Sequence, residues 1–180
     1  MATGPGTDNE PIREICNDIG IDCPFIKRHE NDVLGRYVDV AKLYRANVIV
    51  RITGDCPLID SDIVDKVVNV LEYDDFSSNV FKRTYPKGLD TEVFTYDTLL
   101  RLNRLCRDGD REHVTLYIYK NKDLFKSVSL EDVEDNSHLN WSVDYPEDFS
   151  FVGEVFDWMK GEYKDYREIM EYVKWQGIQN

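Results

Sequence analysis

A chain of 180 residues with 42% hydrophobic residues can bury one core, so we expect a single domain over residues 1–180. The formal net charge of −13 argues against nucleic acid as a partner, because an acidic chain repels the phosphate backbone. No apolar run is long enough to span a membrane and no signal peptide opens the chain. We therefore expect a soluble, cytoplasmic protein without a membrane partner.

The first half of the chain alternates between helical and strand patterns. Apolar residues recur at helical spacing in three segments, and two short segments between them have strand character. The expected helices cover residues 10–18, 32–45 and a segment from 61, and the expected strands cover 23–27 and 47–53. This alternation predicts an α/β fold, a three-layer sandwich whose mixed, mostly parallel sheet has helices on both faces.

The second half changes character. Two strand patterns bracket a loop rich in turn residues. Two helical patterns follow, then two further strand patterns that could form a hairpin, and the chain ends in helical patterns. The expected strands cover residues 75–80, 91–95, 124–130 and 138–143, and the expected helices cover 97–107, 111–121, 146–159 and 165–175. The four cysteines form no C-x-x-C pair, so we expect reduced thiols rather than a zinc site.

Two acids stand where strands are expected to end. The segment Val48–Asp60 predicts a buried strand that stops at Gly54 and leaves Asp55 at its carboxyl end, where α/β sheets bind ligands. Asp144 also follows an apolar strand pattern, and a proline follows each acid by two positions. Both acids are candidate ligands for a hard metal ion. The alternatives are a turn cap for Asp55 and a helix N-cap for Asp144.

The segment Arg51-Ile52-Thr53-Gly54-Asp55-Cys56-Pro57-Leu58-Ile59-Asp60 resembles the metal-binding strand of the spore coat polysaccharide biosynthesis protein F family. That family is similar to the CMP-sugar-acid synthetases, which are cytidylyltransferases. Four further stretches match in the same order along the chain, and the resemblance rests on all five together. They are Asp32–Tyr37, Arg83–Asp90 with Glu92–Phe94, Arg111–Thr115 and Val143–Asp148.

The resemblance implies a fold like that of nucleotide-diphospho-sugar transferases and the transfer of CMP from CTP to a sugar acid. It assigns Asp55 and Asp144 as the catalytic ligands of Mg²⁺. Such a transfer depends on positioning and on neutralising charge on the phosphate oxygens. It also implies substrate contacts from Arg83, Lys87 and Asp90 near the acceptor sugar, and from His113.

Three arginines are candidates on chemical grounds, because a guanidinium group pairs bidentately with phosphate. They are Arg28, Arg36 and Arg51. The alternative for each is a salt bridge, since the chain carries 35 acids. The alternative for His113 is a structural histidine among helix neighbours.

The same resemblance implies that this chain lacks a segment with which the family's sequences begin. The family opens with a strand and a basic loop of the type Ala-Arg-x-x-Ser-x-Arg-Leu-Pro-Gly-Lys that holds the triphosphate, whereas this chain opens at Met1-Ala2-Thr3-Gly4-Pro5. We therefore expect the 180 residues to be inactive by themselves. We also expect rearranged strand pairing, completion by another chain or a homodimer, because a missing strand leaves sheet edges open.

Two other functions remain open. A non-catalytic module that binds a sugar or a protein partner would keep the core and lose nucleotide transfer. A glycosyltransferase that uses a nucleotide-sugar donor is suggested by two D-x-D patterns, Asp60-Ser61-Asp62 and Asp108-Gly109-Asp110. The first pattern is better explained as a helix start and the second as a connection between helices.

Overall fold

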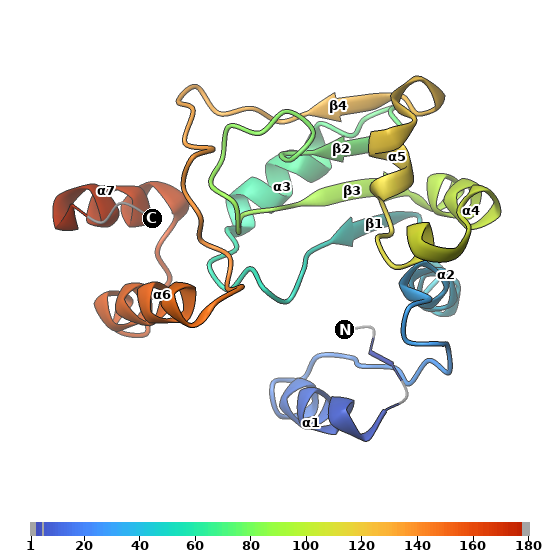
Figure 1. The fold of residues 1–180 in the computed structure, drawn as a ribbon, viewed down its shortest axis with the longest axis horizontal. Coiled ribbons are helices and arrows are strands. Elements are labelled where there is room, and N and C mark those ends of the chain that lie inside the picture. Colours follow the sequence, from blue (N-terminus) through green and yellow to red (C-terminus); the bar gives the residue numbers. More distant parts are fainter. Residues whose placement is uncertain (1–2, 5, 178–180) are drawn as a thin grey trace. The chain divides into compact units, whose positions relative to one another are not determined.

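The computed structural model describes residues 3–4 and 6–177. Figure 1 shows an α/β fold with short strands. The strands are β1 (Val48–Arg51), β2 (Phe76–Ser78), β3 (Glu92–Thr95) and β4 (Ser127–Ser129). The helices are α1 (Glu10–Asp18), α2 (Val33–Leu43), α3 (Ser61–Asn69), α4 (Tyr96–Leu105), α5 (Leu116–Lys120), α6 (Pro146–Met159) and α7 (Tyr166–Gln176).

The four strands form one mixed sheet in the order β1-β3-β2-β4. Strands β2 and β4 pair in parallel, with Phe76 opposite Ser127, whereas β3 runs against its neighbours in Figure 1. The expected α/β class with a mixed sheet is confirmed. Parallel pairing is less extensive than the alternation of helices and strands suggested, because β3 lies between β1 and β2 in the opposite direction.

The chain divides into two units, which we describe separately. Unit 1 contains Met1–Ile49 and Phe94–Lys126, and unit 2 contains Val50–Val93 and Ser127–Asn180. In unit 1, α2 packs on α4, and both helices carry fully buried leucines. Short 3-10 turns lie at Thr7–Asn9 before α1, at Asp108–Arg111 between α4 and α5, and at Lys122–Leu124 after α5. Its buried apolar residues include Leu34, Ala41, Phe94, Leu99, Leu102, Cys106, Val114, Ile118 and Phe125.

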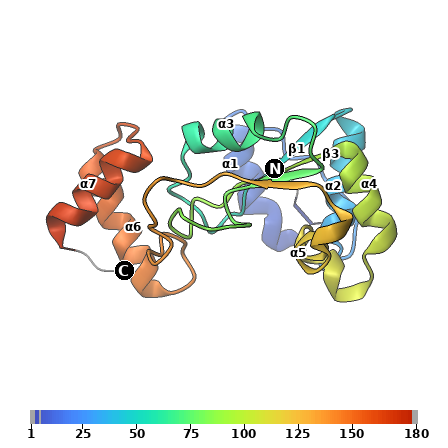
Figure 2. The ribbon, with the colours of Figure 1, turned by 90° about the horizontal axis from the view of Figure 1, so that it is seen from above.

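In the core of unit 2, one face of each of the helices α3, α6 and α7 packs against buried loop residues. Helices α6 and α7 lie side by side in Figures 1 and 2. The rings of Trp158 and Tyr172 stack between them with centroids 4.5 Å apart. Trp141 and Leu89, both fully buried, come from loops rather than from regular elements. Burial of these side chains therefore fixes the loops of unit 2 as well as its helices.

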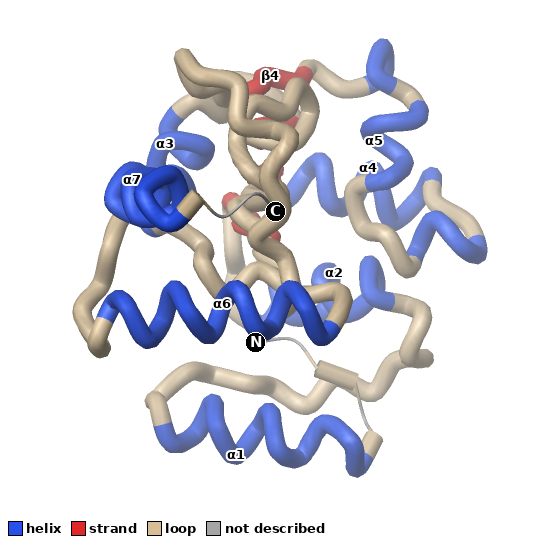
Figure 3. The backbone as a smooth tube through the Cα atoms, turned by 60° about the vertical axis from the view of Figure 1, so that its left-hand side comes forward, coloured by secondary structure: helices blue, strands red, loops and turns tan. Residues whose placement is uncertain are grey.

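Several expected boundaries are confirmed, and two expected strands are wrong. Residues 23–27 form no strand, and their described ladder pairing is one isolated bridge between Phe25 and Thr3. Helices α1 and α6 have the bounds that the sequence predicted. Residues 138–143 do not form a strand or a hairpin, since β4 pairs with β2. Figure 3 shows this segment as loop, and its ladder pairing is limited to one bridge between Lys87 and Asn140. Because the segment lies at the core of unit 2, its apolar residues produced a strand-like pattern.

All four cysteines are free, as expected, and Cys16, Cys56 and Cys106 are buried. Within residues 3–4 and 6–177, no helix combines the length and the apolar character that crossing a bilayer requires.

Candidate active site

Asp55 lies on an exposed turn that follows β1 in unit 2. The turn is closed by the main-chain N–H of Cys56, which donates to the carbonyl oxygen of Thr53 at 3.3 Å. The thiol of Cys56 lies inside, 3.2 Å from the Thr53 hydroxyl, and its burial raises its pKa to about 11. Cys56 is therefore a protonated packing group at neutral pH, and Asp55 is the group that the turn presents to solvent.

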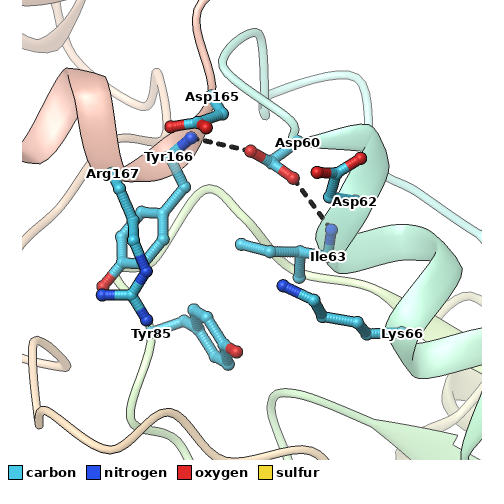
Figure 4. A pocket seen from close by; sticks show the side chains of 8 residues that line it. All are labelled: Asp60, Asp62, Ile63, Lys66, Tyr85, Asp165, Tyr166 and Arg167. Carbon is cyan, nitrogen blue, oxygen red and sulfur yellow. Dashed lines mark hydrogen bonds between the residues drawn. The ribbon is translucent and has the colours of Figure 1, made fainter.

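Asp60 fixes the far end of this turn. Its Oδ1 accepts from the N–H of Ile63 at 2.8 Å and caps α3, while its Oδ2 accepts from the N–H of Tyr166 at 2.7 Å. Figure 4 shows the carboxylate between the first turns of α3 and α7, beside a pocket of about 80 Å³. One buried acid thus satisfies donors of two helix N-termini. Both of its oxygens are engaged, which supports the helix-start explanation of the first D-x-D pattern.

The loop that carries Lys87 is held against the chain before Asp144. The N–H of Lys87 donates to the Leu139 carbonyl at 3.0 Å, and the N–H of Trp141 donates to the Lys87 carbonyl at 2.6 Å. Gly88 has a φ of +102°, and a Cβ there would lie 2.4 Å from the carbonyl carbon of Trp141. Only glycine fits this close approach of two backbones without strain.

Asp144 directs its carboxylate toward Lys87 rather than toward the helix behind it. Its Oδ2 accepts from Lys87 Nζ at 2.6 Å and from the Ser142 hydroxyl at 3.1 Å. The start of α6 is capped instead by Asp148, whose Oδ2 accepts from the N–H groups of Asp144 and Tyr145, each at 2.9 Å. The N-cap alternative for Asp144 is therefore wrong, because the N-cap residue is Tyr145 and Asp148 completes its capping box.

The structure brings Asp55 and Asp144 to neighbouring positions. The main-chain N–H of Val143, the residue before Asp144, donates to the Asp55 carbonyl oxygen at 2.9 Å. Hydrogen bonds from Lys87 and Ser142 lower the pKa of Asp144. The hydrogen bond to Asp144 raises the pKa of Lys87 against the opposing effect of burial, and the charges of Asp55 and Asp90 add to the increase. Two carboxylates and one ammonium group thus share one electrostatic environment.

The other basic candidates of unit 2 have acidic partners. Arg83 forms a bidentate pair with Asp90, with distances of 2.6 and 2.7 Å. Arg51 donates to Glu92 at 2.6 Å, and the Glu92 side chain is buried. The first pair gives the loop before β3 its shape. The second pair connects β1 to β3.

Three candidates belong to unit 1. Arg28 pairs with Asp39 at 2.7 Å and with Asp32 at 3.2 Å, which is the salt-bridge alternative for this residue. Arg36 donates to the carbonyl oxygens of His29 and Glu30, at 3.3 and 2.7 Å. His113 is exposed, and its carbonyl oxygen accepts from Leu116 at the start of α5.

Sequence reasoning missed an ion pair that joins two of the matched stretches. Arg111 Nε donates to Asp32 Oδ1 at 2.7 Å, and Arg111 Nη2 donates to Asn103 Oδ1 at 2.9 Å. Asp32 and Arg111 line a cavity of about 360 Å³, together with His29, Asn31, Gly109 and Glu112. Asp32 and Arg111 are the first residues of their stretches, and opposite charges at these positions were the available signal.

The residues of unit 2 fit a divalent cation that is partly held by substrate. Among the described residues, no group of three or more His, Cys, Asp or Glu side chains is arranged to hold a metal alone. Asp55 and Asp144 supply hard oxygen donors on adjacent loops, and the Lys87 ammonium group already stands as a cation beside one of them. Mg²⁺ is commonly bound by one or two carboxylates together with substrate phosphates and water. This donor set therefore suits Mg²⁺ better than a soft metal ion.

Asp55, on the turn after β1, and Asp144, on a loop bonded to that turn, are paired acids of an α/β fold, and such a pair suits a metal ion that is shared with phosphate groups. The chain belongs to the cytidylyltransferase family, whose model matches residues 6–178. It is 35% identical over 179 residues to an uncharacterised protein of Methanocaldococcus jannaschii, covering 96% of this chain and 71% of that protein. It is also 29% identical over 131 residues to the spore coat polysaccharide biosynthesis protein SpsF of Bacillus subtilis, covering 71% of this chain and 54% of SpsF.

The chain is also similar to solved structures, of which two are described. A cytidylyltransferase from Leptospira borgpetersenii superposes with a TM-score of 0.91 and 32% identity, covering 97% of this chain and 75% of that chain. CMP:2-keto-3-deoxy-manno-octonic acid synthetase, solved in complex with CTP, gives a TM-score of 0.53 at 12% identity over 85% of this chain and 78% of that chain. The second likeness concerns the fold alone. The expected cytidylyltransferase family is confirmed, whereas membership of the spore coat polysaccharide biosynthesis protein F group and the missing N-terminal part stay predictions.

Proposed function

We propose that this protein transfers CMP from CTP to a sugar acid in the biosynthesis of a surface or spore-coat polysaccharide. The observation that carries the proposal is the hydrogen bond between Val143 and Asp55, which sets Asp55 beside Asp144 within unit 2. Membership of the cytidylyltransferase family supports CTP as the donor, and the likeness to SpsF supports the polysaccharide pathway.

Asp55 and Asp144 would hold Mg²⁺, which when bound neutralises charge on the phosphate oxygens during transfer. Arg83, Lys87 and Asp90 share one loop, and we assign them to the acceptor sugar. The bidentate Arg83–Asp90 pair keeps that loop in one conformation, so that binding does not have to order it.

We assign the remaining candidates to the nucleotide and the sugar. Arg28, Arg36, Arg51 and His113 are proposed substrate contacts. Arg28 and Arg51 would have to contact substrate while retaining, or after leaving, their partners Asp39 and Glu92. The acid partners would then serve to orient each guanidinium group.

The test is pyrophosphate release from CTP and a panel of sugar acids by the full product of the gene. Replacing Asp55 or Asp144 with Asn should reduce metal-dependent turnover by at least about 100-fold, because the charge that holds the metal is lost. Asp62→Asn is the matched control, since Asp62 lies in the first turn of α3 and should leave turnover unchanged. Turnover that survives both active-site substitutions would refute the assignment.

We further propose that the 180 residues by themselves transfer no CMP. Arg28, Arg51, Arg83 and Lys87 are each already paired with a carboxylate, so binding a triphosphate requires an ion pair to be exchanged. Isothermal titration of the isolated chain with CTP and Mg²⁺ should give little heat. Pyrophosphate release by this chain at the rate of the full gene product would contradict the proposal.

The same pairing favours a second candidate, a non-catalytic module that binds a sugar or a partner protein. The Asn variants separate the two functions, because a module would keep its affinity for the partner after Asp55 and Asp144 are neutralised. A glycosyltransferase would be detected by hydrolysis of sugar nucleotides.

Other expectations from the sequence stay predictions. They are a single functional domain over residues 1–180, a cytoplasmic location, and either a homodimer or completion by another chain. Light scattering that shows a monodisperse monomer would count against the last two.

A further inference from the structure

Lys87 is fixed at its backbone and has a partly exposed side chain. The main-chain bonds to Leu139 and Trp141 hold the residue in place, while 48% of its side chain is exposed. Asp144 is likewise held at its backbone by Asp148, and 38% of its side chain is exposed. Because the 2.6 Å contact between Lys87 and Asp144 is at the surface, it contributes little to stability and can exchange readily.

The charges around Lys87 do not balance. Asp55, Asp90 and Asp144 all act on its ammonium group. Asp90 is neutralised by its bidentate pair with Arg83. Among the described residues, no lysine or arginine forms an ion pair with Asp55. The single positive charge of Lys87 therefore faces the two negative charges of the carboxylates that we assigned as metal ligands, so the net charge of the three groups is negative.

We propose that Lys87 and the divalent cation compete for the carboxylate of Asp144, so that the lysine acts as an internal substitute for the metal in the free protein. The inference rests on the proposed function, because it takes Asp144 as a metal ligand. Lys87 must release Oδ2 before that oxygen can bind a cation, and its four-carbon stem allows the release without movement of the backbone.

The exchange would couple metal binding to substrate binding. Once Asp144 has released it, the Lys87 ammonium group is beside the site without a fixed counter-ion. An anionic oxygen of a phosphate or of a sugar carboxylate is the chemical group that would pair with it. Every charge then keeps a partner: the acids pair with the cation, and the lysine pairs with the substrate.

The experiment measures binding of Mn²⁺ alone, without nucleotide, from the electron paramagnetic resonance signal of the unbound ion. Lys87→Met should tighten Mn²⁺ binding by about fivefold, the factor that corresponds to roughly 1 kcal/mol for an exposed ion pair. Lys82→Met is the matched control, because Lys82 is 72% exposed, pairs with Glu131 and carries the same charge. It should change the affinity by less than about twofold.

The same lysine substitution, made in an Asp144→Asn protein, distinguishes competition for the carboxylate from simple repulsion between Lys87 and the cation. In a protein that also carries Asp144→Asn, Lys87→Met should no longer tighten Mn²⁺ binding, because the shared carboxylate is gone. Equal gains from the Lys82 and Lys87 variants, a gain that persists without Asp144, or no Mn²⁺ binding by wild type and Lys87→Met alike would each overturn the proposal. Since no CTP or sugar is present, these outcomes are independent of whether the protein transfers CMP.

Discussion

The main-chain N–H of Val143 lies 2.9 Å from the carbonyl oxygen of Asp55 and joins two loops that are distant in sequence. The bond uses backbone atoms alone, so it positions the carboxylate of Asp55 and that of the neighbouring Asp144 without occupying either. The loop of Lys87 is attached to the same segment through Leu139 and Trp141. Backbone hydrogen bonds within unit 2 thus assemble the candidate site.

Gly88→Ala should lower the free energy of unfolding by about 2 kcal/mol or more, because the new Cβ would lie 2.4 Å from the Trp141 carbonyl carbon at a φ of +102°. Urea unfolding followed by tryptophan fluorescence measures the loss. The control is Gly153→Ala within α6, where no atom lies within 4 Å of the added Cβ. That change should stabilise by up to about 1 kcal/mol. Equal effects of the two substitutions would contradict the close approach at Gly88.

Asp60→Ala should destabilise the protein by about 2 to 3 kcal/mol, since the N–H groups of Ile63 and Tyr166 would both lose their acceptor inside the protein. Thermal and urea unfolding measure the change. Asp62→Ala is the control, because it removes an acid from the first turn of α3 but no hydrogen bond between helices. It should lower the free energy of unfolding by about 0.5 kcal/mol. If the Asp60 variant is no less stable than the Asp62 variant, the link between α3 and α7 is not important.

The ion pair between Asp32 and Arg111 should show a coupling energy of about 1 kcal/mol in a double-mutant cycle. The variants are Asp32→Asn, Arg111→Gln and the double replacement, each followed by urea unfolding. Arg111 also holds Asn103, and Asp32 also pairs with Arg28 and caps α2 through the N–H of Gly35, so each single variant loses more than the pair and the double variant is needed. Strictly additive effects would mean that the two matched stretches of unit 1 are not coupled through this pair.

Cys56 should make stability dependent on alkaline pH. Its pKa is raised from 9.0 to about 11 in the folded protein, chiefly by burial, so the folded state holds the proton more tightly than the unfolded state. The resulting stability is fully present below pH 9 and is lost as the pH rises from 9 to about 11. Unfolding free energies of wild type and Cys56→Ser, compared across this range, should diverge with wild type falling faster. Parallel curves would show that the thiol titrates equally in both states.

The sequence by itself determined much of the helical structure. Pro11 and Pro146 lie in the first turns of α1 and α6, the two helices whose expected bounds are the observed ones. These signals are local, since each depends on residues within one or two turns. Local chemistry also singled out Asp55 and Asp144, since each is an acid after an apolar run with a proline two positions on; Asp55 follows β1, whereas Asp144 follows a loop.

Only the tertiary structure decided which loops meet. Pairing of β4 with β2, the position of β3 against its neighbours, and the contacts of Lys87 and Asp60 join residues that are far apart in the chain. Residues 138–143 were expected to form a strand because buried residues such as Leu139 and Trp141 make a loop look like one. Hydrophobic burial and the need to satisfy buried N–H groups are properties of the folded core, so periodicity along the sequence could not reveal them.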